Sequence, residues 1–595
     1  MQRKTGWTLL VVVALLVVVG VNVGGCNGDE ADGTGGANGG TATGLQASVT
    51  DPEAENPDRG RWVDLSTVPF RPEAVGGTLV FARQSAYKSL NNITRRTESL
   101  RGIFENLLAP YLLAVPADPH PVNGFAPIPC AAKKLPTLSA DRLSSVWTLR
   151  DDLTWEDGKP LTAEDYAFTW RLVQSPEAPF RKRGVLSFVK DVKARDAHTL
   201  EVTFKRPYYN SIATFGVEFP VVPAHATSPD AKVLTDTHRT LSFGPYKIAE
   251  WDTAQLRLTL RNEYREKPFP LWPCYVENIV YRTTESSAIE ELAKQGEIDI
   301  AALKPLRFEA VGKDPGFRRV CWRSLFDLPA YQYVAWNTKD PKNPSRPHPL
   351  FGTAAVRRAM AMLIDREHII AKMRQGMAKR VNGPYWHRDP EYDTTVAQIP
   401  YDPDGARKIL EGLGWKLNAE NLLEKDGQVF RFELGVYNLP MWTEPAAVIR
   451  DGAKKAGVDV VLLTQPWDPF AAAIGGKRFD AYIIGESLRP PIEQDLWPMF
   501  HSSQATIPGS SNYVGLTDPL LADKLLDAVR VEFDRSKRLL LRKQFHRVFD
   551  QLHPFTVLYT VYSPVVISRR WANVKIHALG VRFRDFVLRD RFQKD

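Results

Sequence analysis

The chain has 595 residues, 44% of them hydrophobic, and carries a formal net charge of +8. This length allows a large core and two or three domains, and it excludes a small disulfide-held scaffold. The lysines and arginines form no long run, so the positive charge does not indicate a nucleic-acid-binding protein.

The amino terminus has the features of a bacterial export signal. Arg3 and Lys4 precede an apolar stretch at 7–23, and small residues then lead to Cys26. This order is typical of a lipoprotein and predicts a signal peptide at 1–25 with acylation of Cys26. An uncleaved membrane anchor is the alternative, because about 20 apolar residues can span a bilayer.

Residues 26–61 are rich in small and polar residues and are predicted to form a flexible tether. The glycine-rich run at 33–40 is not a phosphate loop, because no strand precedes it and no helix follows. Signal, acylation site and tether together predict a periplasmic protein of the cell envelope that is anchored to a membrane through Cys26. Which membrane holds it is left open.

The three further cysteines are Cys130, Cys274 and Cys321, and their spacing matches no metal-binding motif. An oxidising compartment permits at most one disulfide among them, with one thiol left over. Three buried free thiols are the alternative.

The first half of the body alternates strands and helices. An apolar run at 79–84 predicts a strand, and apolar residues at helical spacing predict a helix over 100–107. The string WTLRDDLTWEDGKPLTAEDYAFTW at 147–170 predicts a strand, a turn at Asp157-Gly158 and a helix capped by Thr162 and Asp165.

The second half continues this alternation. Helices are predicted at 356–364 and from Asp402, an N-cap followed by proline. The run at 458–463 predicts a strand buried within a sheet. Helices are expected within 520–549, and the apolar run at 557–568 predicts an extended crossing.

The string at 147–170 closely resembles the W-x-L-R-x-x-x-x-F-x-D-G-x-P-x-T-A-x-D-V signature of the family 5 extracellular solute-binding proteins, the peptide- and nickel-type receptors of ABC importers. Further similarity lies in IFENL at 103–107, FGPYKI at 243–248 and VRRAMAMLIDREHII at 356–370. The resemblance runs in order from about residue 77 to 577.

The resemblance implies an α/β fold of the periplasmic binding protein type II kind, with two lobes and a subdomain inserted in the first. Two crossings, near 323–331 and 558–565, would let the lobes bend about a hinge and bury a solute between them. The implied division is 1–25 signal peptide, 26–61 tether, 62–95 lobe I, 96–222 inserted subdomain, 223–325 lobe I again, 326–560 lobe II and 561–595 the return to lobe I.

One departure from the family pattern concerns the ligand. Peptide-binding members carry an aspartate a few residues beyond an "fD-x-x-x-x-G" strand, and it pairs with the peptide ammonium; at that offset this chain has Arg489. Glu486 or Asp495 would supply the carboxylate if the loop path differs. Arg489 would instead bind a carboxylate or phosphate, or point to solvent.

Other candidates follow from position and side-chain type. They are Ser487 beside Glu486, Ser85 and Tyr87 after the first strand, Tyr385 and Trp386 in a loop resembling the family's "p-x-g-p" segment, and Trp442 in a similar loop. Aromatic side chains suit a cleft that accepts varied groups, and ordinary packing is the alternative for each. His387 has no partner at metal-ligand spacing, so neither a metal site nor a cofactor is expected.

The resulting hypothesis is a lipid-anchored receptor of an ABC importer that captures a peptide or similar solute. Its expected partners are permease subunits and a membrane, and it is expected to be monomeric. A sensor or interaction protein of the same fold, signalling to a membrane partner, is the alternative. The sequence contains no G-x-S-x-G or H-E-x-x-H motif, so an enzyme is not expected.

Overall fold

The computed structural model describes residues 51–93, 98–120, 124–178, 180, 183–230, 240–488, 494–507 and 509–592. The signal segment, the acylation site Cys26 and Arg489 lie outside the described residues. The fold is α/β, as predicted.

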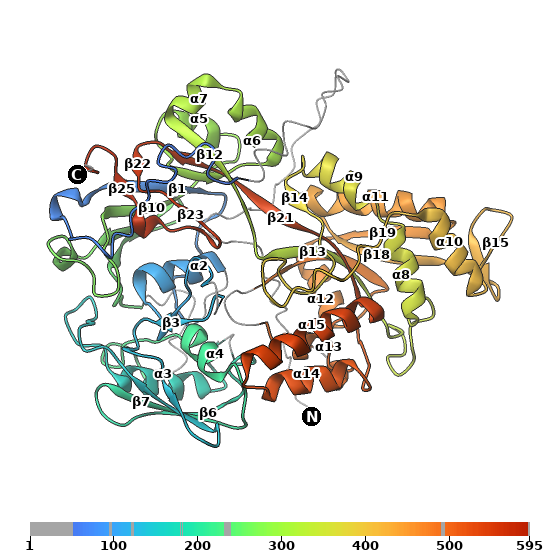
Figure 1. Ribbon diagram of the computed structural model, residues 1–595, viewed down its shortest axis with the longest axis horizontal. Helices are drawn as coiled ribbons and strands as arrows, with labels where there is room; N and C mark the ends of the chain where they lie inside the picture. The colour runs from blue at the N-terminus through green and yellow to red at the C-terminus, as the bar shows by residue number, and fades with distance from the viewer. Residues whose placement is uncertain are drawn as a thin grey trace, which may run out of the picture.

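A twelve-stranded sheet runs through both halves of the molecule (Figure 1). Its order is β19 (Asp459–Gln465), β18 (Arg431–Tyr437), β20 (Ala481–Ser487), β13 (Ala330–Trp336), β21 (Phe555–Ser568), β11 (Ile300–Ala302), β1 (Gly76–Arg83), β10 (Val276–Thr283), β9 (Gln255–Leu260) and β8 (Tyr246–Trp251), while β12 (Cys321–Asp327) and β14 (Ala378–Lys379) pair with β21. The extended crossing expected at 557–568 is therefore β21.

We use lobe I for residues 62–95, 223–325 and 561–595, and lobe II for 326–560. The described α-helices of lobe I are α5 (Ile289–Lys294), α6 (Pro305–Gly312) and α7 (Pro315–Val320). Those of lobe II are α8 (Ala354–Met362), α9 (Arg366–His368), α10 (Pro403–Gly412), α11 (Pro440–Lys455), α12 (Trp467–Gly475), α13 (Trp497–Phe500), α14 (Ala522–Val531) and α15 (Arg535–Leu552). As predicted, Asp402 caps α10 by accepting a hydrogen bond from the Gly405 amide.

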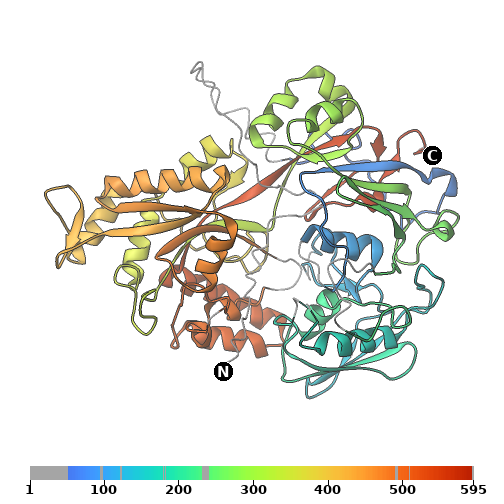
Figure 2. The same cartoon turned by 180° about the vertical axis from the view of Figure 1, so that it is seen from behind.

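We use inserted subdomain for residues 96–222, which contain a separate four-stranded sheet and lie beside α14 and α15 of lobe II (Figure 2). The sheet order is β4 (Thr137–Leu138), β5 (Ser144–Thr148), β7 (Thr199–Phe204) and β6 (Val189–Ala194), and the helices are α2 (Glu98–Ile103), α3 (Ala163–Gln174) and α4 (Ser211–Glu218). The predicted capping box of Thr162 and Asp165 is present at the start of α3.

The remaining strands form short pairs or ladders. They are β2 (Leu113–Ala114) with β3 (Ile128–Pro129), β15 (Lys416–Leu417) with β16 (Leu423–Lys425) and β17 (Gln428–Val429), β22 (Trp571–Ala572) with β25 (Val587–Leu588), and β23 (Ile576–His577) with β24 (Gly580–Val581).

Two predictions about lobe II were wrong in detail. The strand expected to be buried is β19, which lies at the sheet edge and leaves Val461 43% and Leu463 38% exposed. An apolar run does not distinguish a central strand from an edge strand. Trp442, expected in a loop, lies in the first turn of α11, because Pro440 is accommodated at the start of a helix.

Residues 51–62, which we call the N-terminal strap, pack against the body. The Glu55 carboxylate accepts hydrogen bonds from the Arg323 guanidinium on β12, at 2.7 and 3.1 Å, and from the Arg323 amide at 3.1 Å. Asp58 makes two bonds of 2.9 Å to Arg589. Composition predicted a tether through residue 61 because the segment has few apolar residues, but its acidic groups bind distant arginines instead.

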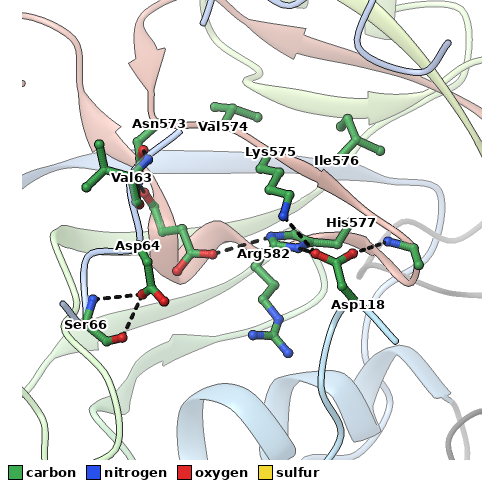
Figure 3. A network of polar contacts seen from close by, with 12 residues as sticks. Val63, Asp64, Ser66, Asp118, Asn573, Val574, Lys575, Ile576, His577 and Arg582 are labelled. Atoms are coloured by element: carbon green, nitrogen blue, oxygen red, sulfur yellow. Dashed lines mark hydrogen bonds and ion pairs between the residues drawn. The ribbon is translucent and has the colours of Figure 1, made fainter. Parts of the chain in front are cut away.

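A polar cluster joins the inserted subdomain to the carboxyl-terminal segment (Figure 3). Asp118 Oδ2 lies 2.8 Å from both Lys575 Nζ and His577 Nδ1, and Asp118 Oδ1 accepts a 2.8 Å bond from the Ala578 amide. Partial burial raises the pKa of Asp118, but these contacts lower it more, so the pKa lies below its ordinary value. The ionised carboxylate thus connects segments that are over 450 residues apart.

The lowered pKa predicts a pH-dependent contribution to stability. A carboxyl group with a depressed folded-state pKa stabilises the fold above its unfolded pKa of about 4, and this contribution is lost as the pH falls through the folded pKa. We expect Asp118→Asn to lower the melting temperature by roughly 1–3 °C at pH 7. This difference in melting temperature between variant and wild type should become smaller as the pH falls. Calorimetry between pH 7 and pH 3 measures this.

Asp151→Asn is the matched control, because Asp151 is an exposed aspartate of the same subdomain, 3.7 Å from Lys133. The interpretation of Asp118 is wrong if both variants follow the same melting curve at every pH.

Candidate functional site

The strand directions place the carboxyl ends of two strands near the crossings between the lobes. Strand β21 pairs with β13 in lobe II and with β11 in lobe I, antiparallel in both cases. Since β1 is parallel to β11, it runs toward lobe II, and β20, antiparallel to β13, runs toward lobe I. Side chains at the carboxyl ends of parallel strands commonly form binding sites in α/β sheets. The candidate site therefore lies where the ends of β1 and β20 approach the two crossings.

Glu486, near the end of β20, faces a small tyrosine-lined recess. The recess has a volume of about 100 Å³. Its lining residues are Tyr333, Ile474, Tyr482, Ile484, Gly485, Glu486, Met499, Ser511 and Tyr513. Burial, with a further contribution from the Glu486 charge, raises the pKa of Tyr513 to about 12 and that of Tyr333 and Tyr482 well above 10. The hydroxyls stay protonated at neutral pH, so the recess offers polar groups and aromatic faces beside one carboxyl group.

Ser487 and Trp442 belong to the other face of the sheet. Successive side chains of a strand point to opposite faces, so the Ser487 side chain points away from that of Glu486. The Trp442 ring of α11 packs against Gly485, where an added Cβ would lie 3.2 Å from it. The structure therefore does not bring Trp442 and Glu486 into one pocket.

Tyr385 and Trp386 are both buried, and Trp386 is tied to the hinge. Trp386 Nε1 donates a 3.0 Å hydrogen bond to Asp327 at the end of β12, and Arg388 Nε donates a 2.7 Å bond to the same carboxylate. Burial opposes ionisation of Asp327, but His387 and Arg388 hold its pKa below the ordinary value. Trp386 thus fixes a lobe II loop to the crossing, and Tyr385 lies beneath the Arg542 guanidinium at 5.2 Å.

Asp495 lies between lobe II and the inserted subdomain. Its Oδ2 accepts bonds of 3.0 and 2.6 Å from Arg530 and of 3.3 Å from the Tyr208 hydroxyl. Beside it, the Tyr209 amide donates to the Arg530 carbonyl at 3.1 Å. The Asp495 carboxylate is therefore already engaged by protein groups in this conformation.

A larger cavity, of about 300 Å³, lies next to this contact. The inserted subdomain supplies a mainly apolar wall, and lobe II supplies a charged one. The lining residues are Leu113, Pro119, Gly124, Phe125, Ala126, Pro127, Leu135, Tyr209, Asn210, Ile212 and Ala213 on the first side, and Arg388, Asp389, Pro390, Glu391, Gln494, Arg535 and Arg538 on the second. Sequence reasoning missed this cavity because its walls are hundreds of residues apart and carry no motif.

The lobe I candidates follow β1. Ser85 is exposed, whereas the Tyr87 ring is buried and its backbone carbonyl accepts a 2.9 Å bond from Trp251 Nε1. Among the described residues, no group of three or more His, Cys, Asp or Glu side chains is arranged to hold a metal ion. Cys130, Cys274 and Cys321 are buried free thiols, which resolves the alternative left open by their spacing.

Comparison with known proteins identifies the family. The profile described as "Bacterial extracellular solute-binding proteins, family 5 Middle" matches residues 126–506, more than half of the chain. The chain belongs to this family. Across the described residues, no helix is long and apolar enough to cross a membrane.

Individual relatives are more distant. The chain is 25% identical over 449 residues to the oligopeptide-binding protein AppA of Bacillus subtilis, covering 72% of this chain and 77% of AppA. It is 24% identical to the nickel-binding periplasmic protein of Escherichia coli, covering 74% and 82%.

Solved structures show the same fold. AppA of Bacillus subtilis in complex with a nonapeptide superposes with a TM-score of 0.70 at 21% identity, covering 86% of this chain and 99% of AppA. NikA of Brucella suis in complex with Fe(III)-EDTA gives 0.72 at 18% identity, covering 86% and 100%. At this identity the similarity establishes the fold alone.

Proposed function

We propose that this protein is the lipid-anchored substrate-binding receptor of an ABC importer and captures a peptide or similar solute between its lobes. The observation that carries the proposal is the geometry at the hinge, where β1 and β20 point their carboxyl ends toward each other across two strand crossings. Family membership and the similarity to an oligopeptide-binding protein support it.

Hinge closure gives this geometry a function. Bending at β12 and β21 would bring the residues after β1 toward Glu486 and expel water from the space between them. Polar contacts strengthen when water is excluded, so the loaded closed form differs from the empty open form. A permease that prefers the closed form then receives only loaded receptor.

The chemistry around Glu486 favours a solute with a cationic or strongly polar group. One carboxyl group beside three protonated tyrosines would accept an ammonium through a charge-assisted hydrogen bond and ring contacts. We propose Glu486 as the amine-binding alternative and Arg489 as the anion-binding alternative. Nickel-binding relatives make a chelated metal a second candidate solute.

Sensing remains a second function for the same fold. In that case the closed form would bind a membrane signalling partner instead of a permease. Deleting the permease abolishes uptake of the solute under the importer hypothesis, whereas a sensor would leave uptake unchanged and alter a transcriptional response.

Membrane attachment is predicted to depend on a single thiol. Cys26→Ser removes the acylation site, so the protein should move from the membrane fraction to the soluble fraction. Fractionation with mass spectrometry of the amino-terminal peptide checks this. Continued sedimentation of a chain that retains residues 1–25 would instead indicate an uncleaved anchor.

Peptides with an acetylated amine or an amidated carboxylate show which charge of the solute the protein recognises. With a bound peptide as the probe, Glu486→Gln should weaken binding about tenfold or more by calorimetry, provided the peptide amine is free; acetylating the amine should remove the difference from wild type. If Arg489 binds the peptide carboxylate, Arg489→Gln should weaken the binding of peptides with a free carboxylate, and amidating that carboxylate should remove the difference from wild type.

Asp518→Asn serves as the control in both series, because Asp518 accepts hydrogen bonds from the Leu521 and Ala522 amides and lies outside the recess. Equal affinity of wild type, Glu486→Gln and Arg489→Gln for all peptides would remove both residues from the site.

A further inference from the structure

Arg83, the last residue of β1, is a buried cation with unusual surroundings. Its side chain is 2% exposed, and its Nε and Nη1 atoms have no hydrogen-bond partner. Within the part of the chain that the structure describes, no carboxylate lies within ion-pair distance of it. Its guanidinium carbon lies 3.2 Å from the centre of the Tyr87 ring, and the Tyr87 hydroxyl also lacks a partner.

Arg357 is a second buried arginine and provides a comparison, because its contacts are those of a structural residue. Arg357 is 3% exposed and donates hydrogen bonds to the carbonyls of Phe351, Leu552 and His553. Burial lowers the pKa of both Arg83 and Arg357 to about 10, so both stay charged at neutral pH. Burying a charge is costly unless hydrogen bonds replace its water, and Arg357 has these bonds whereas Arg83 has only ring contacts.

The position of Arg83 connects it to the candidate site. Arg83 pairs with Thr283 on β10 and lies two residues beyond Phe81, which is level with Ile300 of β11. Because β11 pairs with β21 there, Arg83 lies at the level of the hinge crossing. The exposed Ser85 follows two residues later, so Arg83 lies two residues before an exposed position at the carboxyl end of β1.

We propose that Arg83 is a binding site for an anionic group of the solute, a carboxylate or a phosphate, which reaches the guanidinium when the Tyr87 ring moves aside. The planar fork of an arginine suits two parallel bonds to such a group, and a buried position makes them strong. In the conformation described, the Tyr87 ring covers one face of the guanidinium, and the Nε and Nη1 atoms have no hydrogen-bond partner. This inference rests on the proposed function, since it names the chemical class of the solute.

The test uses small anions and thermal melting of the full chain. Inorganic phosphate and acetate, each compared with chloride at equal ionic strength, should raise the melting temperature of the wild type more than that of Arg83→Met. Without these anions, Arg83→Met should melt at or above the wild-type temperature, because the variant removes a buried charge that has no counter-charge.

Arg357→Met is the matched control and should melt well below wild type, because it leaves three carbonyls without their donor. Tyr87→Ala should increase the response to phosphate by opening the guanidinium face, which provides a readout even if Arg83→Met does not fold. A larger response to phosphate than to acetate would identify phosphate as the preferred anion.

Two results would overturn the proposal: Arg83→Met losing as much stability as Arg357→Met, or wild type and Arg83→Met responding equally to both anions.

Peptide binding separates this inference from the proposed function. Failure to bind any peptide, with the anion response intact, contradicts peptide capture alone. If wild type and Arg83→Met bind peptides with the same affinity, and amidation of the peptide carboxylate changes neither affinity, the anion site is contradicted and peptide capture is not.

Discussion

The architecture depends on one long strand that forms hydrogen bonds in both lobes. Strand β21 has 14 residues, pairs with β13 and β14 in lobe II and with β11 in lobe I, and has β12 alongside it from Cys321 to Asp327. These ladders fix the register of the two lobes, because a slip of one residue would turn every side chain to the wrong face. All other site features are placed relative to this two-stranded connection.

Strand β12 is held at both ends by charges from elsewhere in the chain. Near one end Arg323 is bound by Glu55 of the N-terminal strap, and at the other Asp327 accepts bonds from Trp386 and Arg388. The strap follows the predicted lipid anchor, so the segment leading from the membrane would meet the body at the hinge. Burial opposes the ionisation of Glu55, but Arg323 holds the pKa of Glu55 below its ordinary value, so this attachment persists at neutral pH.

Local patterns in the sequence predicted the scaffold well and the site less well. The apolar run of β1, the capping box at Thr162 and the Asp402 cap are encoded within a few residues, so they could be recognised without the fold. The edge position of β19 depends on neighbours that a local pattern does not specify. The helical position of Trp442 follows instead from Pro440, a local signal that also suits a loop. The placement of Tyr333 and Tyr513 beside Glu486 and the engagement of Asp495 by Arg530 bring together residues tens to hundreds of positions apart. No motif signals them.

The predicted candidates also separate into different roles once the fold is known. Glu486 faces a recess and Ser85 is exposed after β1, which are positions suited to ligand contact. Trp386 and Asp495 instead bind protein groups that hold lobe II to the hinge and to the inserted subdomain. Residue type alone did not distinguish these roles, because a tryptophan or aspartate in a loop suits both.

The central claim is that the lobes close about β12 and β21 when a solute binds, and small-angle X-ray scattering tests it most directly. The protein would be released from the membrane, freed of bound solute by gentle denaturation and refolding, and measured before and after addition of the molecules recovered from it. The account predicts a smaller radius of gyration with the recovered solute and no change with an unrelated solute. An unchanged radius of gyration at a solute concentration that saturates binding by calorimetry would contradict it.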